Sequence, residues 1–137
     1  MIFQKTIEVA TRQRGLLEIT DRVQAAVAET GLSSGLANIF IHHTSASLII
    51  SENADPDVLR DLETLLARMA PDADPDYLHT AEGPDDMAAH MRTVLTATSL
   101  SIPVTQGRCA LGTWQGLYLW EHRETPHQRT LTITMTG

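Results

Sequence analysis

Apolar and polar residues alternate along much of this chain, at the period of two that is typical of β-strands. The alternation is clearest near the two ends, over residues 2–9 and 129–136. Shorter apolar segments predict five further strands, over residues 36–42, 46–51, 99–104, 109–113 and 117–123. Residues 113–116 (TWQG), which lie between the last two of these, are typical of a hairpin connection.

Three other segments carry apolar residues at steps of three and four, which predicts helices with one buried face. The first is residues 21–30, which Gly31 ends. The second begins at Asp55-Pro56, because aspartate suits the N-cap and proline the first helical position. The third covers residues 85–97 and has two aspartates in its first turn, where they suit the helix dipole.

The order of these elements is not a regular alternation of strand and helix. It favours an α+β fold with a mainly antiparallel, sandwich-like sheet arrangement and two to three helices. At 137 residues, we expect a single domain over residues 1–137. No apolar run approaches the roughly 20 residues of a membrane span, and the start lacks the features of a signal peptide. We therefore expect a cytoplasmic protein with no membrane partner.

Charge and cysteine content narrow the functional classes. The formal net charge of −7 argues against binding nucleic acid, because that binding depends on neutralising phosphates. A bound cation would reverse the local sign and let the protein hold a phosphate. The one cysteine, Cys109, excludes an intrachain disulfide and a cysteine-rich zinc site, and we expect a small buried side chain.

Four of the six histidines lie in residues 42–43 and 79–90, each close to an acid. Imidazole beside carboxylate is common material for a divalent-metal site or for proton transfer. Asp86 and His90 are one helical turn apart and can share a ligand, while His79 comes from the preceding loop. The alternative is a surface ion pair with an unrelated loop histidine.

The segment around His43 is rich in hydroxyl groups, which suit either a strand edge or the phosphate of a ligand. Glu52 follows an apolar strand, and Asp55 either caps the next helix or lies at an anion site at its amino terminus. Trp114 in the TWQG segment either stacks on a ligand ring or packs under a turn. Alternation places Glu121 on the face of its strand opposite to His122.

Taken together, these motifs resemble the YjbQ family, whose members carry the name secondary thiamine-phosphate synthase. The matching segments are HHTSASLIISENADPDVLRD, YLHTAEGPDDMAAHMR, SLSIPVTQGR and LGTWQGLYLWEHR, in this order over residues 38–123. The resemblance implies a homotrimer, a polar cleft near the subunit interfaces, and a divalent metal, with zinc expected and magnesium an alternative for a pyrophosphate substrate.

Carried over by position, the resemblance implies a role for ten residues. The expected metal ligands are His43, His79 and His90. The expected catalytic acids are Glu52, Asp55, Asp86 and Glu121. The expected ligand-binding residues are Ser45, Thr113 and Gln115.

Three functions remain open on the sequence. The first is a metal-dependent enzyme acting on a phosphorylated small molecule, with a secondary activity that joins a pyrimidine pyrophosphate to a thiazole phosphate and releases pyrophosphate. The second is a non-catalytic trimeric module that binds a metabolite or a metal. The third is a structural trimer with surface histidines.

Overall fold

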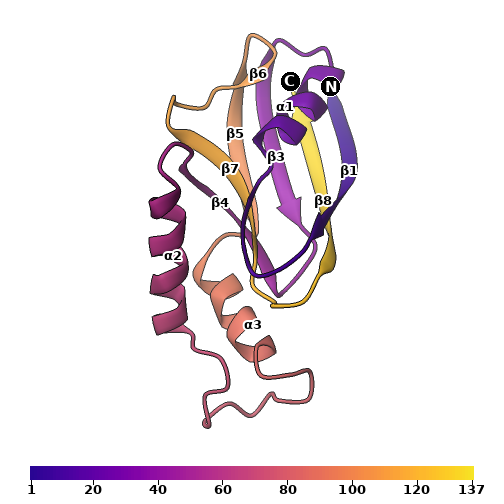
Figure 1. Cartoon of the computed structure of the whole chain (residues 1–137). Helices are drawn as coiled ribbons and strands as arrows, with labels where there is room; N and C mark the ends of the chain where they lie inside the picture. The colour runs from indigo at the N-terminus through magenta and orange to yellow at the C-terminus, as the bar shows by residue number, and fades with distance from the viewer.

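The computed structural model describes all 137 residues and contains three helices and eight strands, which form two antiparallel sheets (Figure 1). The helices are α1 (Thr20–Glu29), α2 (Pro56–Met69) and α3 (Asp86–Leu95). The strands are β1 (Ile2–Thr11), β2 (Gly15–Glu18), β3 (Ser34–Ile41), β4 (Ala46–Glu52), β5 (Ser99–Thr105), β6 (Arg108–Cys109), β7 (Gln115–Glu121) and β8 (His127–Thr136). The predicted α+β class with mainly antiparallel strands is confirmed.

The larger sheet has the strand order β1-β8-β3-β5-β6, and the smaller one has the order β2-β7-β4. The two ends of the chain pair along their whole length, from Ile2 opposite Thr136 to Thr11 opposite His127. The alternation of β8 places Leu131, Ile133 and Met135 on its buried face.

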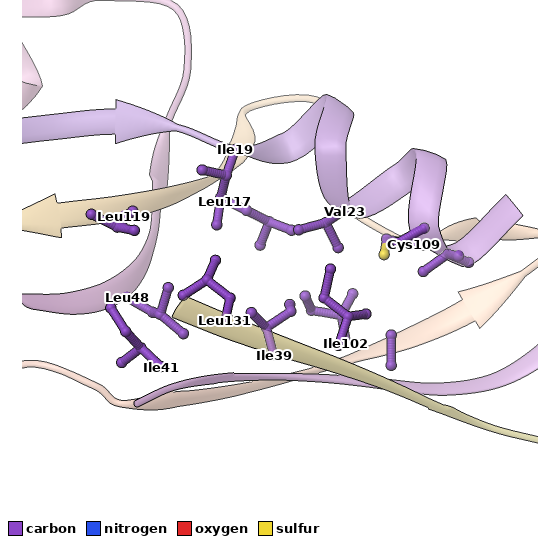
Figure 2. Close-up of a cluster of buried hydrophobic side chains, with 14 of the residues drawn as sticks. Ile19, Val23, Ile39, Ile41, Leu48, Ile102, Cys109, Leu117, Leu119 and Leu131 are labelled. Atoms are coloured by element: carbon purple, nitrogen blue, oxygen red, sulfur yellow. The ribbon is translucent and has the colours of Figure 1, made fainter. Parts of the chain in front are cut away.

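The hydrophobic core lies between the two sheets and α1, as Figure 2 shows. It contains 18 buried residues, including Leu48 from β4, Leu117 from β7 and Val23 from α1. Burying one such side chain stabilises a protein by roughly 1.5–3 kcal/mol relative to leaving it exposed. Cys109 belongs to this cluster and is buried, as predicted.

Helices α2 and α3 lie beside β4, away from α1 (Figure 1). The predicted start of α2 is confirmed, since the Asp55 carboxylate accepts a hydrogen bond from the Asp57 N–H at 2.9 Å. Glu63 of α2 accepts hydrogen bonds from Arg92 of α3 at 2.6 Å and from the Trp120 indole of β7 at 2.7 Å. None of the three helices is long and apolar enough to cross a membrane.

Two sequence predictions about the sheets are wrong. The strand predicted over residues 109–113 is present only at Cys109, since β6 contains Arg108 and Cys109 alone. The Gln24 side chain of α1 accepts a hydrogen bond from the Cys109 N–H at 2.8 Å. Residues 113–116 do not connect a hairpin, since β6 pairs with β5 whereas β7 pairs with β2 and β4. The chain there crosses from one sheet to the other. Strand β2 was not predicted, because four residues are too few to show a period.

Candidate functional site

The structure divides the ten candidate residues into three groups. The first group is His79, Asp86 and His90, from the α2–α3 loop and α3. The second group is His43, Ser45 and Glu121, which gather around Arg129. The third group is Glu52, Asp55, Thr113 and Gln115, near the start of α2.

The first group could hold a metal ion. One ring nitrogen each from His79 and His90 and one carboxylate oxygen of Asp86 all lie within 4.8 Å of one another. The Oδ2 atom of Asp86 is 2.7 Å from His79 Nε2 and 3.1 Å from His90 Nε2. The Asp86 side chain is 2% exposed, so its carboxylate lies on the buried side of the group. The two imidazoles are more exposed and lie nearer the surface.

Hydrogen bonds with neighbouring residues fix the orientation of His90 and Asp86. His90 donates its Nδ1–H to the Thr44 carbonyl at 2.9 Å, which leaves Nε2 as the ring nitrogen that faces Asp86 and could coordinate a metal. Histidines that bind metals commonly donate their other N–H to a carbonyl in this way. Arg123 donates one hydrogen bond to Oδ1 of Asp86 at 2.9 Å and another to Oδ2 of Asp85 at 3.0 Å.

Asp86 is held in its ionised form. Burial by itself raises the pKa of this carboxyl, but the hydrogen bond from His79 and the charges of His90 and Arg123 outweigh it. The net pKa of Asp86 is below its usual value. The pKa of Asp85 is also lowered, because its contacts with Arg123 and the Glu124 N–H outweigh burial.

The second group adjoins the first but is built around a buried ion pair. Arg129 and Glu121 are 4% and 1% exposed, and the guanidinium also donates to Ser45 Oγ at 3.0 Å. His43 accepts a hydrogen bond at Nε2 from the Thr130 N–H at 2.8 Å, and its Nδ1 lies 3.3 Å from Arg129. Burial and the charge of Arg129 lower the pKa of His43. The structure therefore does not place His43 among the atoms that converge on Asp86.

The third group lies at the other end of the smaller sheet. Gln115 and Glu121 are the two ends of β7. Six residue steps along a strand span about 20 Å, so Glu52, which pairs with Gln115, is far from the first two groups. Asp55 caps α2, and Asn53 bonds the carbonyls of Thr113 and Gln115. Within one chain, the single polar cleft expected from the sequence does not include these four residues.

Two cavities flank the first group. One of about 400 Å³, which we call the threonine cavity, is lined by His43, Thr44, His90, Thr93, Val94, Thr96 and Thr98. The other, of about 390 Å³, is the loop cavity, and its lining includes Asp74, Tyr77, His79, Thr80 and Gly83. Both volumes are typical of small-molecule sites, which are roughly 300–1,000 Å³. One histidine of the first group therefore lines each cavity.

Sequence reasoning missed the arginines that support the site. Arg129 lies on β8 in phase with the buried residues Leu131 and Ile133, and a charge on an apolar face is a signal that a buried partner exists. Arg123 carried no such signal, because its carboxylate partners lie 37 and 38 residues away in the sequence.

The His-Asp-His group fits a divalent metal. Two imidazoles and one carboxylate give three protein ligands, and this number leaves a coordination position open for water or a substrate. The nitrogen donors favour zinc, because magnesium prefers oxygen ligands.

Comparisons with known proteins agree with the sequence motifs. The family described as UPF0047 protein YjbQ-like matches residues 5–137. A Synechocystis protein named UPF0047 protein sll1880 is 48% identical over 98% of this chain and 91% of its own length. The Escherichia coli O157:H7 protein named UPF0047 protein YjbQ is 39% identical over 100% of this chain and 99% of its own.

A solved structure shares the fold as well. The crystal structure of an uncharacterized conserved protein of the YjbQ/UPF0047 family from Clostridium acetobutylicum superposes with a TM-score of 0.85. The two chains are 35% identical, and the match covers 98% of this chain and 99% of the other. With agreement in motifs, sequence and fold over nearly its whole length, the chain belongs to the YjbQ (UPF0047) family.

Proposed function

We propose that the protein binds one divalent metal, zinc, through His79, Asp86 and His90. The observation that carries this proposal is the convergence of three ligand atoms within 4.8 Å, on a carboxylate that is almost fully buried. The hydrogen bond from His90 to the Thr44 carbonyl supports it, because that bond engages Nδ1 and orients Nε2 toward Asp86, where it could coordinate. His43 acts in the lining of the threonine cavity.

We further propose that the site makes the protein a metal-dependent enzyme acting on a phosphorylated small molecule. The chain has a net charge of −7, so phosphate needs a local positive charge to bind. A bound zinc ion would supply that charge and stabilise a phosphate or pyrophosphate leaving group. Thiamine-phosphate synthesis is the candidate secondary activity, in which pyrophosphate leaves a pyrimidine as the pyrimidine joins a thiazole phosphate.

Metal analysis of protein purified without a tag tests the first step. We expect about one zinc per chain in the native protein and in His42→Ala, whose exposed ring lies outside the group. We expect zinc to be lost from His90→Ala, with the same circular dichroism spectrum as the native protein. A folded His90→Ala variant that retains its zinc would contradict the proposal.

A turnover assay tests the second step. Zinc-loaded and magnesium-loaded protein is incubated with a pyrimidine pyrophosphate and a thiazole phosphate, and released pyrophosphate is measured. We expect saturable release that His90→Ala abolishes and His42→Ala retains. Equal release from the native protein and His90→Ala would refute a catalytic role for the metal.

One observation favours the alternative of a non-catalytic binding module. Three buried acids, the proposed ligand Asp86 and its neighbours Asp85 and Glu121, are all held by arginine: Asp85 and Asp86 by Arg123, and Glu121 by Arg129. None of these carboxylates is free to act as a general base. Calorimetry separates the two functions, because a module binds a phosphorylated ligand tightly with no product formed, whereas an enzyme releases pyrophosphate.

The homotrimer and the cytoplasmic location stay predictions. Glu52, Asp55, Thr113 and Gln115 lie far from the metal ligands of their own chain. A trimer would give them a role if its interface brought them to the metal ligands of a neighbouring chain. Light scattering on the purified protein measures the mass. A mass of one chain of 15.0 kDa would exclude this role.

A further inference from the structure

The two cavities beside the proposed metal site differ in charge, although they are similar in size. The loop cavity contains the Asp74 carboxylate, which forms no ion pair with any lysine or arginine of the protein. The threonine cavity contains no carboxylate at all. An anion next to an uncompensated carboxylate is repelled, so a phosphate is disfavoured in the loop cavity.

The residues that line the threonine cavity also carry hydrogen-bond donors that the protein itself does not use. The backbone N–H groups of His43 and Thr44 donate to no acceptor within the protein. The hydroxyls of Thr44 and Thr98 likewise have no partner. These groups satisfy the acceptor oxygens of a phosphate without any lysine or arginine, provided that a metal supplies the positive charge.

The opposite wall of the threonine cavity has a different character. The Thr93 hydroxyl donates to the Ala89 carbonyl at 3.0 Å, and the Thr96 hydroxyl donates to the Arg92 carbonyl at 2.8 Å. Because their protons are committed within α3, these two hydroxyls present only lone pairs to the cavity. A phosphate is therefore directed away from α3 and toward the loop at residues 43–44.

We propose that the phosphate group of the substrate binds in the threonine cavity, against residues 43–44 and Thr98, and that the loop cavity receives the part of the substrate without phosphate. This inference rests on the proposed metal-dependent function. His90 lines the threonine cavity and His79 lines the loop cavity. The two cavities would therefore hold two chemically different parts of the substrate, one on each side of the metal.

Inorganic phosphate is the probe, and amide NMR of the zinc-loaded protein is the measurement. We expect saturable shifts of the amide signals of His43, Thr44 and Thr98, and no such shifts at Tyr77 or Thr80. Thr44→Val and Thr98→Val each weaken phosphate binding about ten- to a hundredfold, as expected for the loss of one hydrogen bond to a charged group. Thr80→Val is the matched control in the loop cavity and changes the affinity less than twofold.

Asp74→Asn tests the other half of the inference. If phosphate binds in the threonine cavity, this change alters its affinity less than twofold. A several-fold gain would place phosphate in the loop cavity and overturn the inference, as would equal weakening by Thr80→Val and Thr44→Val.

Zinc content, measured for every variant, keeps the two proposals apart. If the native protein binds no zinc, the proposed function fails, and this inference fails with it. If zinc is bound and the native protein shows no phosphate-induced shifts, or the threonine variants have no effect, only this inference fails.

Discussion

A buried histidine predicts how the stability of this protein depends on pH. His122 is 0% exposed and directly follows β7. Its Nε2 lies 2.8 Å from Ser47 Oγ, and its Nδ1 is buried without a partner. Burial, followed by the charges of Arg92, Arg14 and Arg129, lowers the pKa of His122 from 6.5 to about 3. The ring is therefore neutral in the folded protein at any pH above about 4.

The direction of the effect follows from proton binding in the two states. Below about pH 6.5 the unfolded chain binds a proton at His122 that the folded protein does not bind. The free energy of unfolding therefore falls as the pH falls from about 6.5 toward 3. At pH 5 the unfolded histidine is about 1.5 pH units below its pKa, which corresponds to a loss of about 2 kcal/mol relative to neutral pH. This amount depends little on the folded pKa as long as it lies below about 4.

Other groups do not obscure this window. The folded pKa values of Asp85, Asp86 and Glu121 are lowered, so their contributions are lost only as the pH falls below about 5. The pKa of His43 is also lowered, so His43 lowers the stability over the same pH range as His122. Its contribution cancels when the native protein is compared with a variant of His122, because both proteins retain His43.

Urea unfolding at pH 7 and pH 5 measures the effect, with a chelator present and the protein concentration fixed. His122→Gln retains a polar group for Ser47 but cannot titrate. We expect the loss of stability between pH 7 and pH 5 to be about 2 kcal/mol smaller in this variant than in the native protein. Ile133→Val, which destabilises the core without changing a titratable group, is expected to retain the native loss. An unchanged loss in His122→Gln would refute the reasoning.

Two further predictions concern the metal site and the backbone. Arg123→Lys is expected to weaken zinc binding about 10–100-fold in a chelator competition assay, because one ammonium cannot hold Asp85 and Asp86 in the geometry of the guanidinium. Arg60→Lys, at an exposed ion pair, is the control, and an equal effect of both changes would contradict a positioning role. Gly35→Ala is expected to cost more than about 2 kcal/mol in urea unfolding, since φ is 155° and a Cβ would lie 2.1 Å from a backbone oxygen. Gly31→Ala, at φ 71° with open space, is expected to cost about 1 kcal/mol, and similar costs at both positions would show that the close approach is not decisive.

Much of the fold was predictable because local patterns report it directly. Period-two alternation predicted β1 and β8, and the Asp55-Pro56 pair predicted the first turn of α2. The short strands were not predictable in the same way. Strand β2 exists because it pairs with β7, about 100 residues later, and nothing in its four residues requires that pairing.

The candidate site, like the fold, was predictable from the sequence only in part. The sequence by itself determined the family and brought Asp86 and His90 onto one face of a helix, because four residues make about one turn. Only the tertiary structure decided that His79 completes this group and that the Thr130 N–H donates to His43 Nε2. It also decided that Glu52 lies at the end of the smaller sheet opposite to Glu121, about 20 Å away along the strand. The physical reason is that spacing along the chain fixes neighbours within one helix or strand, whereas contacts between elements depend on how the sheets and helices pack.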